Sequence, residues 1–235
     1  MLPVAILSGG LATRLRPATE SIPKALIEIH GEPFIAHQLR LLKKMGVGKV
    51  VICVGYLGEM IQDFVRDGRQ IGLSVAYSPD GPSLQGTAGA VKKAIPLLGE
   101  QFLVLYGDSY LECDYEAVSR AFLASGQSGL MTVVRNQNRW EPSNVEFKGQ
   151  QIVAYDKTTN TAAMQYVDYG LSAFHASAFS IPGQQASDLT TTFQELIRHR
   201  QLAGLEINER YHEVGSWQGI RELQAYLSPQ RSRMA

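Results

Sequence analysis

Two glycines and several cations follow the first apolar segment of the chain. In the stretch "AILSGGLATRLRP", Gly9 and Gly10 precede Thr13, Arg14 and Arg16. Glycines permit positive φ angles and close approach of the backbone, so their amides can point at phosphate oxygens. A guanidinium adds a fork of donors that suits phosphate. The alternative is an ordinary strand-to-helix turn with solvated arginines. The stretch matches neither GxxxxGK[ST] nor GxGxxG, yet it predicts an anion-binding loop.

Three charged residues farther along the chain are candidates for phosphate and metal chemistry. Lys24 follows Pro23 in "IPKAL" and suits one phosphate of a triphosphate; otherwise it is a solvated surface lysine. Asp108 follows the apolar run "FLVLYG", where a metal-bound phosphate would lie, because Mg²⁺ prefers a few carboxylates plus phosphate oxygens. The alternative for Asp108 is a turn or helix-cap acid. Glu213 in "YHEVG" is a weaker second candidate.

The stretch "SLQGTAGA" marks the predicted start of a helix. Its glycines would let a flat base approach the backbone, and the amide of Gln85 has the donors and acceptors to contact a base edge. Thr87 is a possible cap for the helix. The alternative is a plain capped helix start with no ligand.

The second half of the chain carries candidate residues for an acceptor molecule. Lys157 follows the apolar strand "QIVAY", so we expect it at a strand end, facing a cleft rim, with Asp156 beside it. Asp168 precedes Gly170 in "VDYGL", and its carboxylate has the capacity to accept two hydroxyl hydrogen bonds from a polyhydroxylated acceptor. The alternative is that Lys157 and Asp168 are surface charges.

Strand and helix signals alternate through the first half of the chain, which predicts βαβ units and a mainly parallel sheet. Expected strands are "VAIL", "KVVICV", "LSVAYS", "FLVLYGD" and "GLMTVV"; expected helices span 32–46, 57–68, 87–98 and 114–126, the last capped by Asp114. In such sheets ligands bind at the carboxyl ends of the strands. The residues after each strand should therefore gather at one edge.

The second half follows a different pattern. "NVEF" and "QIVAYD" predict a small β insertion paired around Gly149, and "VDYGLSAFHA" a long strand. A helix is expected over "LTTTFQELIRHRQLAG" with Gly204 as its stop, and a terminal helix over "SWQGIRELQAYL". We expect a single domain, 1–235, with a nucleotide-binding half of about 1–135 and an acceptor half of about 136–235.

Composition limits the function classes. Lys+Arg and Asp+Glu both number 22, so the net charge is zero, which argues against a nucleic-acid or acidic-membrane binder. No apolar run reaches the length of a membrane span. Cys53 and Cys113 are not spaced as metal ligands are. The apolar N-terminus resembles a first strand and does not resemble a leader peptide. We expect a cytoplasmic protein.

Taken together, the motifs resemble those of the sugar-phosphate nucleotidyltransferases, the NDP-sugar pyrophosphorylases. The stretch from "LSGGLATRLRPATESIPKAL" resembles the family signature G-G-x-G-T-R-L-x-P-x-T-x-x-x-P-K-x-L. "SLQGTAGAV", "YGDS" and "HEVGSWQGI" are similar to the family's base loop, metal-binding G-D and late D-[VI]-G-T segment. The short chain is most similar to heptose-1-phosphate guanylyltransferases and N-acetylmuramate-1-phosphate uridylyltransferases. Ala12 replaces a signature glycine, at a cost of about 1 kcal/mol if φ is positive there, and Glu213 replaces an aspartate.

The resemblance implies a Rossmann-like, GT-A-like α/β fold with helices on both faces of the sheet, and it implies site residues. Arg14, Lys24 and Asp108 would be catalytic, with Mg²⁺ held by Asp108 and Glu213. The residues implied for nucleotide binding are Leu7, Ser8, Gly9, Gly10, Thr13, Arg14, Gln85, Gly86 and Thr87. Those implied for binding the sugar phosphate are Asp108, Asp156, Lys157, Asp168 and Gly170.

The implied reaction transfers a nucleoside monophosphate from an NTP to a hexose or heptose 1-phosphate, releasing pyrophosphate and giving NDP-sugars of the kind used for cell-surface polysaccharides. The implied partners are these two substrates, with no nucleic acid and no membrane, in a monomer or small homo-oligomer. Two alternatives stay open. One is a non-catalytic sugar-nucleotide sensor or regulatory subunit on the same fold, since fold does not fix function. The other is a nucleotidyltransferase for a non-sugar phosphate such as phosphocholine.

Overall fold

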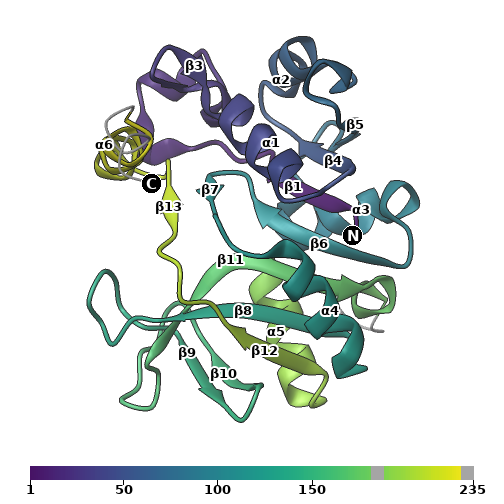
Figure 1. Cartoon of the computed structure of the whole chain (residues 1–235), viewed down its shortest axis with the longest axis vertical. Helices are drawn as coiled ribbons and strands as arrows, with labels where there is room; N and C mark the ends of the chain where they lie inside the picture. The colour runs from purple at the N-terminus through teal and green to yellow at the C-terminus, as the bar shows by residue number, and fades with distance from the viewer. Residues whose placement is uncertain (181–187, 229–235) are drawn as a thin grey trace.

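A single nine-stranded sheet forms the centre of the protein (Figure 1). The computed structural model describes residues 1–180 and 188–228. The strand order is β5-β4-β1-β6-β11-β8-β12-β10-β9. In chain order the bounds are β1 Val4–Ser8, β4 Lys49–Val54, β5 Ser74–Pro79, β6 Gln101–Tyr106, β8 Gly129–Arg135, β9 Val145–Lys148, β10 Gln151–Tyr155, β11 Tyr166–His175 and β12 Leu202–Glu206.

Most strands of this sheet run in the same direction. Strands β5, β4, β1 and β6 pair in parallel, as βαβ connections require. Strand β11 is antiparallel to both β6 and β8, so β8 again runs with β6, and β12 is parallel to β8. The expected fold class, a mixed and mainly parallel sheet with helices on both faces, is confirmed.

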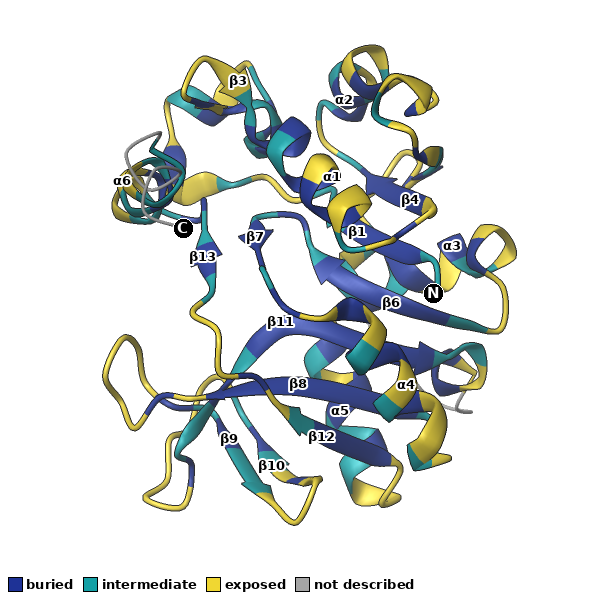
Figure 2. Ribbon diagram, viewed as in Figure 1, coloured by how far each residue is buried: buried dark blue, intermediate teal, exposed yellow. Residues whose placement is uncertain are grey.

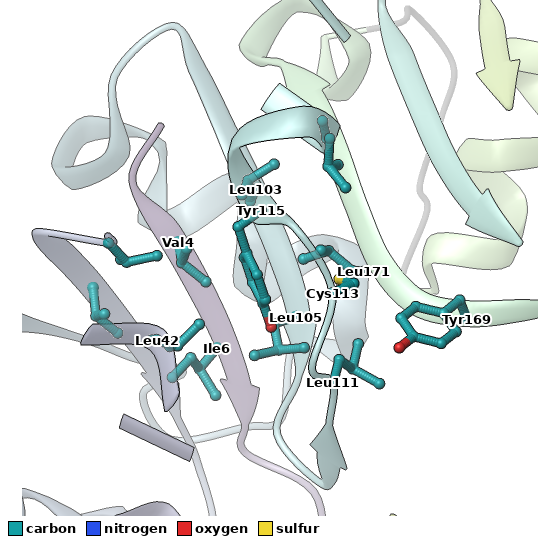
Figure 3. Close-up of a cluster of buried hydrophobic side chains, with 14 of the residues drawn as sticks. Val4, Ile6, Leu42, Leu103, Leu105, Leu111, Cys113, Tyr115, Tyr169 and Leu171 are labelled. Atoms are coloured by element: carbon teal, nitrogen blue, oxygen red, sulfur yellow. The ribbon is translucent and has the colours of Figure 1, made fainter. Parts of the chain in front are cut away.

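Helices cover the two faces of the sheet and bury two apolar layers. Alternate residues of β1 show the division. Val4 and Ile6 pack into one layer, which Figure 3 shows, and Ala5 packs into the other. The first layer includes buried residues of α1, α2 and α4, and the second those of α3 and α5. The helix bounds are α1 Phe34–Lys44, α2 Gly58–Val65, α3 Gly86–Leu98, α4 Tyr115–Ser125, α5 Leu189–Arg198 and α6 Trp217–Tyr226. Within the described ranges, no helix has the length and apolar character needed to span a bilayer.

A third apolar cluster ties the C-terminal helix to the N-terminal loop. Leu15, Ile29 and Phe34 pack there with Val214 and residues of α6. Two short pairings support it: β2 (Glu28–Ile29) with β3 (Glu32–Pro33), and β7 (Ser109–Tyr110) with β13 (His212–Glu213). Figure 1 shows α6 beside the β2–β3 turn, and Figure 2 shows the buried centre of the sheet strands. The β7–β13 pairing brings Glu213 next to the strand end that carries Asp108.

Several local expectations are confirmed and one is wrong. Asp114 caps α4 by accepting a hydrogen bond from the Ala117 amide at 2.9 Å, and β9 and β10 pair antiparallel around Gly149. The helix expected to continue to Gly204 instead ends at Arg198. Gly204 lies within β12, where its missing side chain leaves room for the Phe147 ring. The apolar residues here are spaced as in a helix, so the pattern predicts a helix where the protein forms the short strand β12, which pairing with β8 stabilises.

We expect Gly204→Ala to destabilise the protein by about 1–3 kcal/mol, the usual cost of overpacking a core. A Cβ at this position would lie 2.6 Å from Phe147 Cε2 and 2.7 Å from Ile152 Cδ1. Urea denaturation followed by fluorescence measures the change. Gly48→Ala is the matched control, because a Cβ there has no neighbour within 4 Å. Equal effects of the two substitutions would contradict the packing argument.

Candidate active site

The first cavity lies at the carboxyl ends of β1 and β6 and has a volume of about 230 Å³. Its lining combines small, apolar and charged side chains: Leu7, Ser8, Gly9, Gly10, Lys24, Ala25, Cys53, Asp80, Leu84, Gly86, Thr87, Ala90, Tyr106, Gly107 and Asp108. The structure therefore brings the glycine loop, Lys24 and Asp108 together with the start of α3. This is the edge of the sheet at which ligands of open α/β sheets bind.

The glycine loop is shaped by close packing more than by unusual glycine angles. Neither Gly9 nor Gly10 has a positive φ, so of the two properties that glycine offers the loop uses close approach. A Cβ at Gly9 would lie 3.2 Å from the Gly55 amide nitrogen, and one at Gly107 only 2.3 Å from the Leu7 carbonyl oxygen. The positive φ falls instead on Ala12, at 48°. The side chain that replaces the signature glycine thus sits in the strained left-handed region.

Lys24 and Asp108 form an ion pair with 2.7 Å between Nζ and Oδ2. Lys24 begins a short 3₁₀ turn after Pro23, and the next residue, Ala25, is buried and fixes that turn. Asp108 follows β6, and its carbonyl oxygen accepts a hydrogen bond from the Val214 amide at 2.9 Å. Both side chains are about one-fifth exposed, so each remains open to the cavity.

Glu213 lies close to Asp108. Strand β13 places Glu213 in register with Ser109, and the side chain is half-buried. Burial raises the pKa of Glu213, and the neighbouring charge of Asp108 raises it further. Bringing two carboxylates together in this way costs free energy that a bound cation would recover.

The donor set at this position fits Mg²⁺. In the part of the chain that the structure describes, no group of three or more His, Cys, Asp or Glu side chains is arranged to hold a metal. Mg²⁺ is usually held by one or two carboxylates, with substrate phosphates and waters as its other ligands. Asp108 and Glu213 supply two carboxylates, and the other ligands would be substrate phosphates and waters.

Arg14 lies apart from the first cavity. It is exposed and lines a third cavity together with Glu213, Arg139 and Arg210. Its charge lowers the pKa of Glu213, partly offsetting burial and Asp108. Arg14 therefore lies near Glu213, on the lining of a cavity other than the first. Thr13, also exposed, contributes to none of the cavities described here.

The second cavity adjoins the first and is larger, about 640 Å³. Tyr106 and Asp108 line both cavities. The predicted acceptor residues all line it: Asp108, Asp156, Lys157, Asp168 and Gly170. The rest of its lining is mostly polar: Ser109, Glu141, Pro142, Ser143, Asn144, Thr158, Thr159, Asn160, Tyr169, Tyr211 and Glu213.

Protein groups already engage Asp156 and Asp168, the two aspartates predicted to bind the acceptor. Asp156 Oδ1 accepts hydrogen bonds from Thr158 and the Thr159 amide, which hold the turn after β10 and lower the pKa of Asp156. Asp168 Oδ1 accepts from the Gly170 amide at 3.0 Å, and its Oδ2 contacts two tyrosine hydroxyls. Burial raises the pKa of Asp168, and the charge of Lys157 opposes that shift.

The residues predicted for base recognition have a different local role. The Gln85 side chain donates to the Ser83 carbonyl at 2.9 Å and stabilises its own turn. Thr87 does not cap α3. It is the second residue of the helix, and its hydroxyl accepts from the Leu189 amide at 2.8 Å, which joins α3 to α5. The prediction of Thr87 as a cap is therefore wrong, because the helix begins one residue earlier, at Gly86.

Two residues of the site were not predicted from the sequence. Tyr106 lines both cavities and is the last residue of β6, so the strand-end rule that pointed to Asp108 applies equally to it. Asn144 is the second, and its Oδ1 accepts from the Asp168 amide at 3.1 Å. No local pattern signals Asn144, since its contact depends on the pairing of distant strands.

Comparison with known proteins identifies the family. The family model described as nucleotidyl transferase matches residues 4–229. The chain belongs to the nucleotidyl transferase family. It is 41% identical over 113 residues to an N-acetylmuramate alpha-1-phosphate uridylyltransferase of Neisseria meningitidis, covering 48% of this chain and 49% of that protein. It is 28% identical over 220 residues to the mannose-1-phosphate guanylyltransferase catalytic subunit beta of Xenopus tropicalis, covering 89% of this chain and 60% of that protein.

The alignments thus span about half to three-fifths of the length of these curated relatives. Among solved structures, a protein described as a glucose-1-phosphate thymidylyltransferase from Bacillus anthracis superposes with a TM-score of 0.83 at 18% identity, covering 96% of this chain and 95% of that one. HddC from Yersinia pseudotuberculosis, complexed with GMP-PN, superposes with a TM-score of 0.79 at 19% identity, covering 97% of this chain and 100% of that one. These two likenesses support the fold of this nucleotidyl transferase family member.

For this family member we expect Ala12→Gly to stabilise the fold. The native φ of 48° costs alanine about 1 kcal/mol, and glycine removes that cost while adding some unfolded-state entropy. The entropy cost of glycine is about 0.4–1 kcal/mol, so the net gain in urea denaturation should be up to about 0.5 kcal/mol. Ala18→Gly, in the next short turn, is the control and should lower stability. A destabilised Ala12→Gly protein would contradict the strain argument.

Glu213 gives a pH-dependent prediction. Because its pKa is raised in the folded state, its ionisation costs stability as pH rises from the unfolded value of about 4.5 through the folded pKa. In EDTA at pH 7, Glu213→Gln should therefore raise the urea midpoint, and the gain should shrink toward pH 4. Added Mg²⁺ should stabilise the wild type and have less effect on Glu213→Gln. An unchanged midpoint at pH 7 would show that Glu213 is adequately solvated.

Proposed function

We propose that the protein is a sugar-1-phosphate nucleotidyltransferase, which makes an NDP-sugar and pyrophosphate from an NTP and a sugar 1-phosphate. One observation carries this proposal: the first and second cavities meet at Asp108, where Lys24 and Glu213 also lie. A reaction that joins two phosphates needs both substrates at one point, with charged groups beside them. The family membership agrees with this chemistry.

The first cavity is the proposed nucleotide site. Apolar groups from Leu7, Ala25, Cys53 and Ala90 offer a surface for a base and ribose, while the glycine loop leads toward Lys24. Exposed Leu84 extends this apolar surface at the rim. The close backbone packing at Gly9 and Gly107 keeps the loop in a shape that presents main-chain groups to phosphates.

The second cavity is the proposed acceptor site. Hydroxyl and amide groups from Ser109, Asn144, Thr158 and Asn160 line it, and they suit the hydroxyls of a hexose or heptose. Lys157 is the lysine in its lining and would meet the acceptor phosphate. The named relatives act on N-acetylmuramate 1-phosphate and mannose 1-phosphate, which agrees with a sugar acceptor.

The mechanism follows from charge and position. A sugar-1-phosphate oxygen is already ionised at neutral pH, so it attacks the α-phosphorus without a general base. Lys24 neutralises charge that grows on the α-phosphate, and Arg14, which lines the third cavity together with Glu213, would meet the departing pyrophosphate. Asp108 and Glu213 would hold Mg²⁺, which supplies a Lewis acid and a template when bound. We place the reaction in the cytoplasm, where nucleoside triphosphates are available.

A grid of assays tests the proposal. ATP, CTP, GTP, UTP and dTTP are each combined with glucose, mannose, N-acetylmuramic acid and heptose 1-phosphates, and with phosphocholine. Pyrophosphate release is measured with and without Mg²⁺. We expect release with at least one sugar phosphate and only with Mg²⁺. NTP binding without release anywhere in the grid would favour the sensor alternative, and release with phosphocholine alone would favour a non-sugar acceptor.

Lys24→Ala should lower kcat by roughly 100-fold or more, about 3 kcal/mol, the scale for loss of one preorganised electrostatic contact. Asp108→Asn should abolish turnover at ordinary Mg²⁺ concentrations. Stability should change little in Lys24→Ala, because the Lys24–Asp108 pair is partly solvated. Lys92→Ala, on the exposed face of α3, is the control. Wild-type turnover in Lys24→Ala would remove Lys24 from the mechanism.

A further inference from the structure

The carboxylate of Asp168 is held from several sides by neighbouring strands. Tyr155 Oη at the end of β10 donates to Oδ2 at 3.2 Å, and Tyr106 Oη at the end of β6 lies 3.5 Å from the same oxygen. The Gly170 amide donates to Oδ1 at 3.0 Å, and the Asp168 amide donates to Asn144. The carboxylate thus accepts from three protein donors, which fix it in place and leave about one of its roughly four acceptor sites for a ligand hydroxyl.

The ammonium group of Lys157 lies over the same two tyrosines. Lys157 Nζ is 5.5 Å from the ring centroid of Tyr106 and 5.8 Å from that of Tyr155, within the range of cation–π attraction. The charge of Lys157 acts on Asp168, and also on Asp188 at the start of α5. An exposed lysine after β10 is thereby drawn to one position at the wall of the second cavity.

Tyr155 is separate from both proposed substrate sites. It is 3% exposed and lines neither the first nor the second cavity. Its ring packs edge-on against Phe193 of α5 at 5.6 Å, and its carbonyl accepts from Gln194 at 3.2 Å. Any effect of its hydroxyl on a substrate must therefore pass through another residue.

We propose that Tyr155 is a positioning residue, which acts through Asp168 to hold Lys157 at the acceptor phosphate. The carboxylate of Asp168 then serves the lysine and not a sugar hydroxyl. Tyr106 shares this role but also lines both cavities, where it would contact the substrates. A substitution at Tyr155 therefore tests the positioning of Lys157 without removing a substrate contact. The inference rests on the proposed function for the identity of the anion that Lys157 meets.

A double-mutant cycle tests the coupling, using the sugar 1-phosphate of the grid with the highest turnover. Tyr155→Phe should raise the KM for that sugar phosphate about fivefold, the size expected from one lost hydrogen bond, with kcat and the KM for NTP within twofold of wild type. Lys157→Ala should raise the same KM further. Adding Tyr155→Phe to Lys157→Ala should change nothing more, because the lysine that Tyr155 positions through Asp168 is gone.

Tyr166→Phe is the matched control, since Tyr166 lies on β11, lines neither cavity and packs edge-on against Phe147 at 5.3 Å. It should leave all three kinetic constants unchanged. Additive effects of Tyr155→Phe and Lys157→Ala would overturn the proposal. So would a loss of NTP affinity in Tyr155→Phe equal to its loss of sugar-phosphate affinity.

A second measurement does not depend on turnover. The acetylation rate of Lys157 by acetic anhydride is followed by mass spectrometry, with exposed Lys92 as the internal reference. We expect Tyr155→Phe to raise the Lys157 rate at least twofold, Asp168→Asn to raise it more, and Tyr166→Phe to leave it unchanged. An unchanged rate in Asp168→Asn overturns the positioning of Lys157 even if the enzyme is active. A raised rate in a protein that releases no pyrophosphate supports the positioning and rejects the proposed function.

Discussion

The ion pair between Lys24 and Asp108 joins segments 84 residues apart and fixes the point at which the two cavities meet. A partly exposed pair contributes little stability by itself. Its position depends on the fold around it: Pro23 and buried Ala25 set the turn of Lys24, and β6 and the β7–β13 pairing set Asp108. The folding free energy of this region therefore comes from the surrounding elements. The ion pair defines where a transferred phosphate would be stabilised.

Strand β11 makes the second cavity part of the same rigid sheet as the first. It runs antiparallel between β6 and β8, so the two halves of the chain share one layer of hydrogen bonds. Its register shifts between Asp168 and Ser172, and Gly170 adopts a φ of 97° close to Ser109. This irregular part of β11 lies beside Tyr106, because a Cβ on Gly170 would be 3.5 Å from Tyr106 Cδ2. An acceptor bound there would be aligned with the nucleotide without any movement between separate domains.

The sequence predicted features whose cause is local. Asp108 was predicted because an acid after an apolar strand must lie at the carboxyl edge of the sheet, and Asp114 because a cap needs only its own helix. Non-local causes defeated the same reasoning. Gly204 belongs to a strand only because β8 and Phe147 lie beside it, and Thr87 bonds to Leu189 across the fold. Pattern alone gave no signal for such tertiary contacts.

The acidity of the second cavity bears on how it would accept a phosphate. Five acidic residues line it: Asp108, Glu141, Asp156, Asp168 and Glu213. Protein donors engage the first four: Lys24, the hydroxyl of Tyr211, the turn at Thr158 and Thr159, and the tyrosines with Gly170, respectively. Glu213 differs, because it lies half-buried beside the like charge of Asp108. A doubly charged phosphate entering this cavity would meet that charge unless a cation came with it. In the proposed reaction, the Mg²⁺ expected at Glu213 and Asp108 would offset that charge.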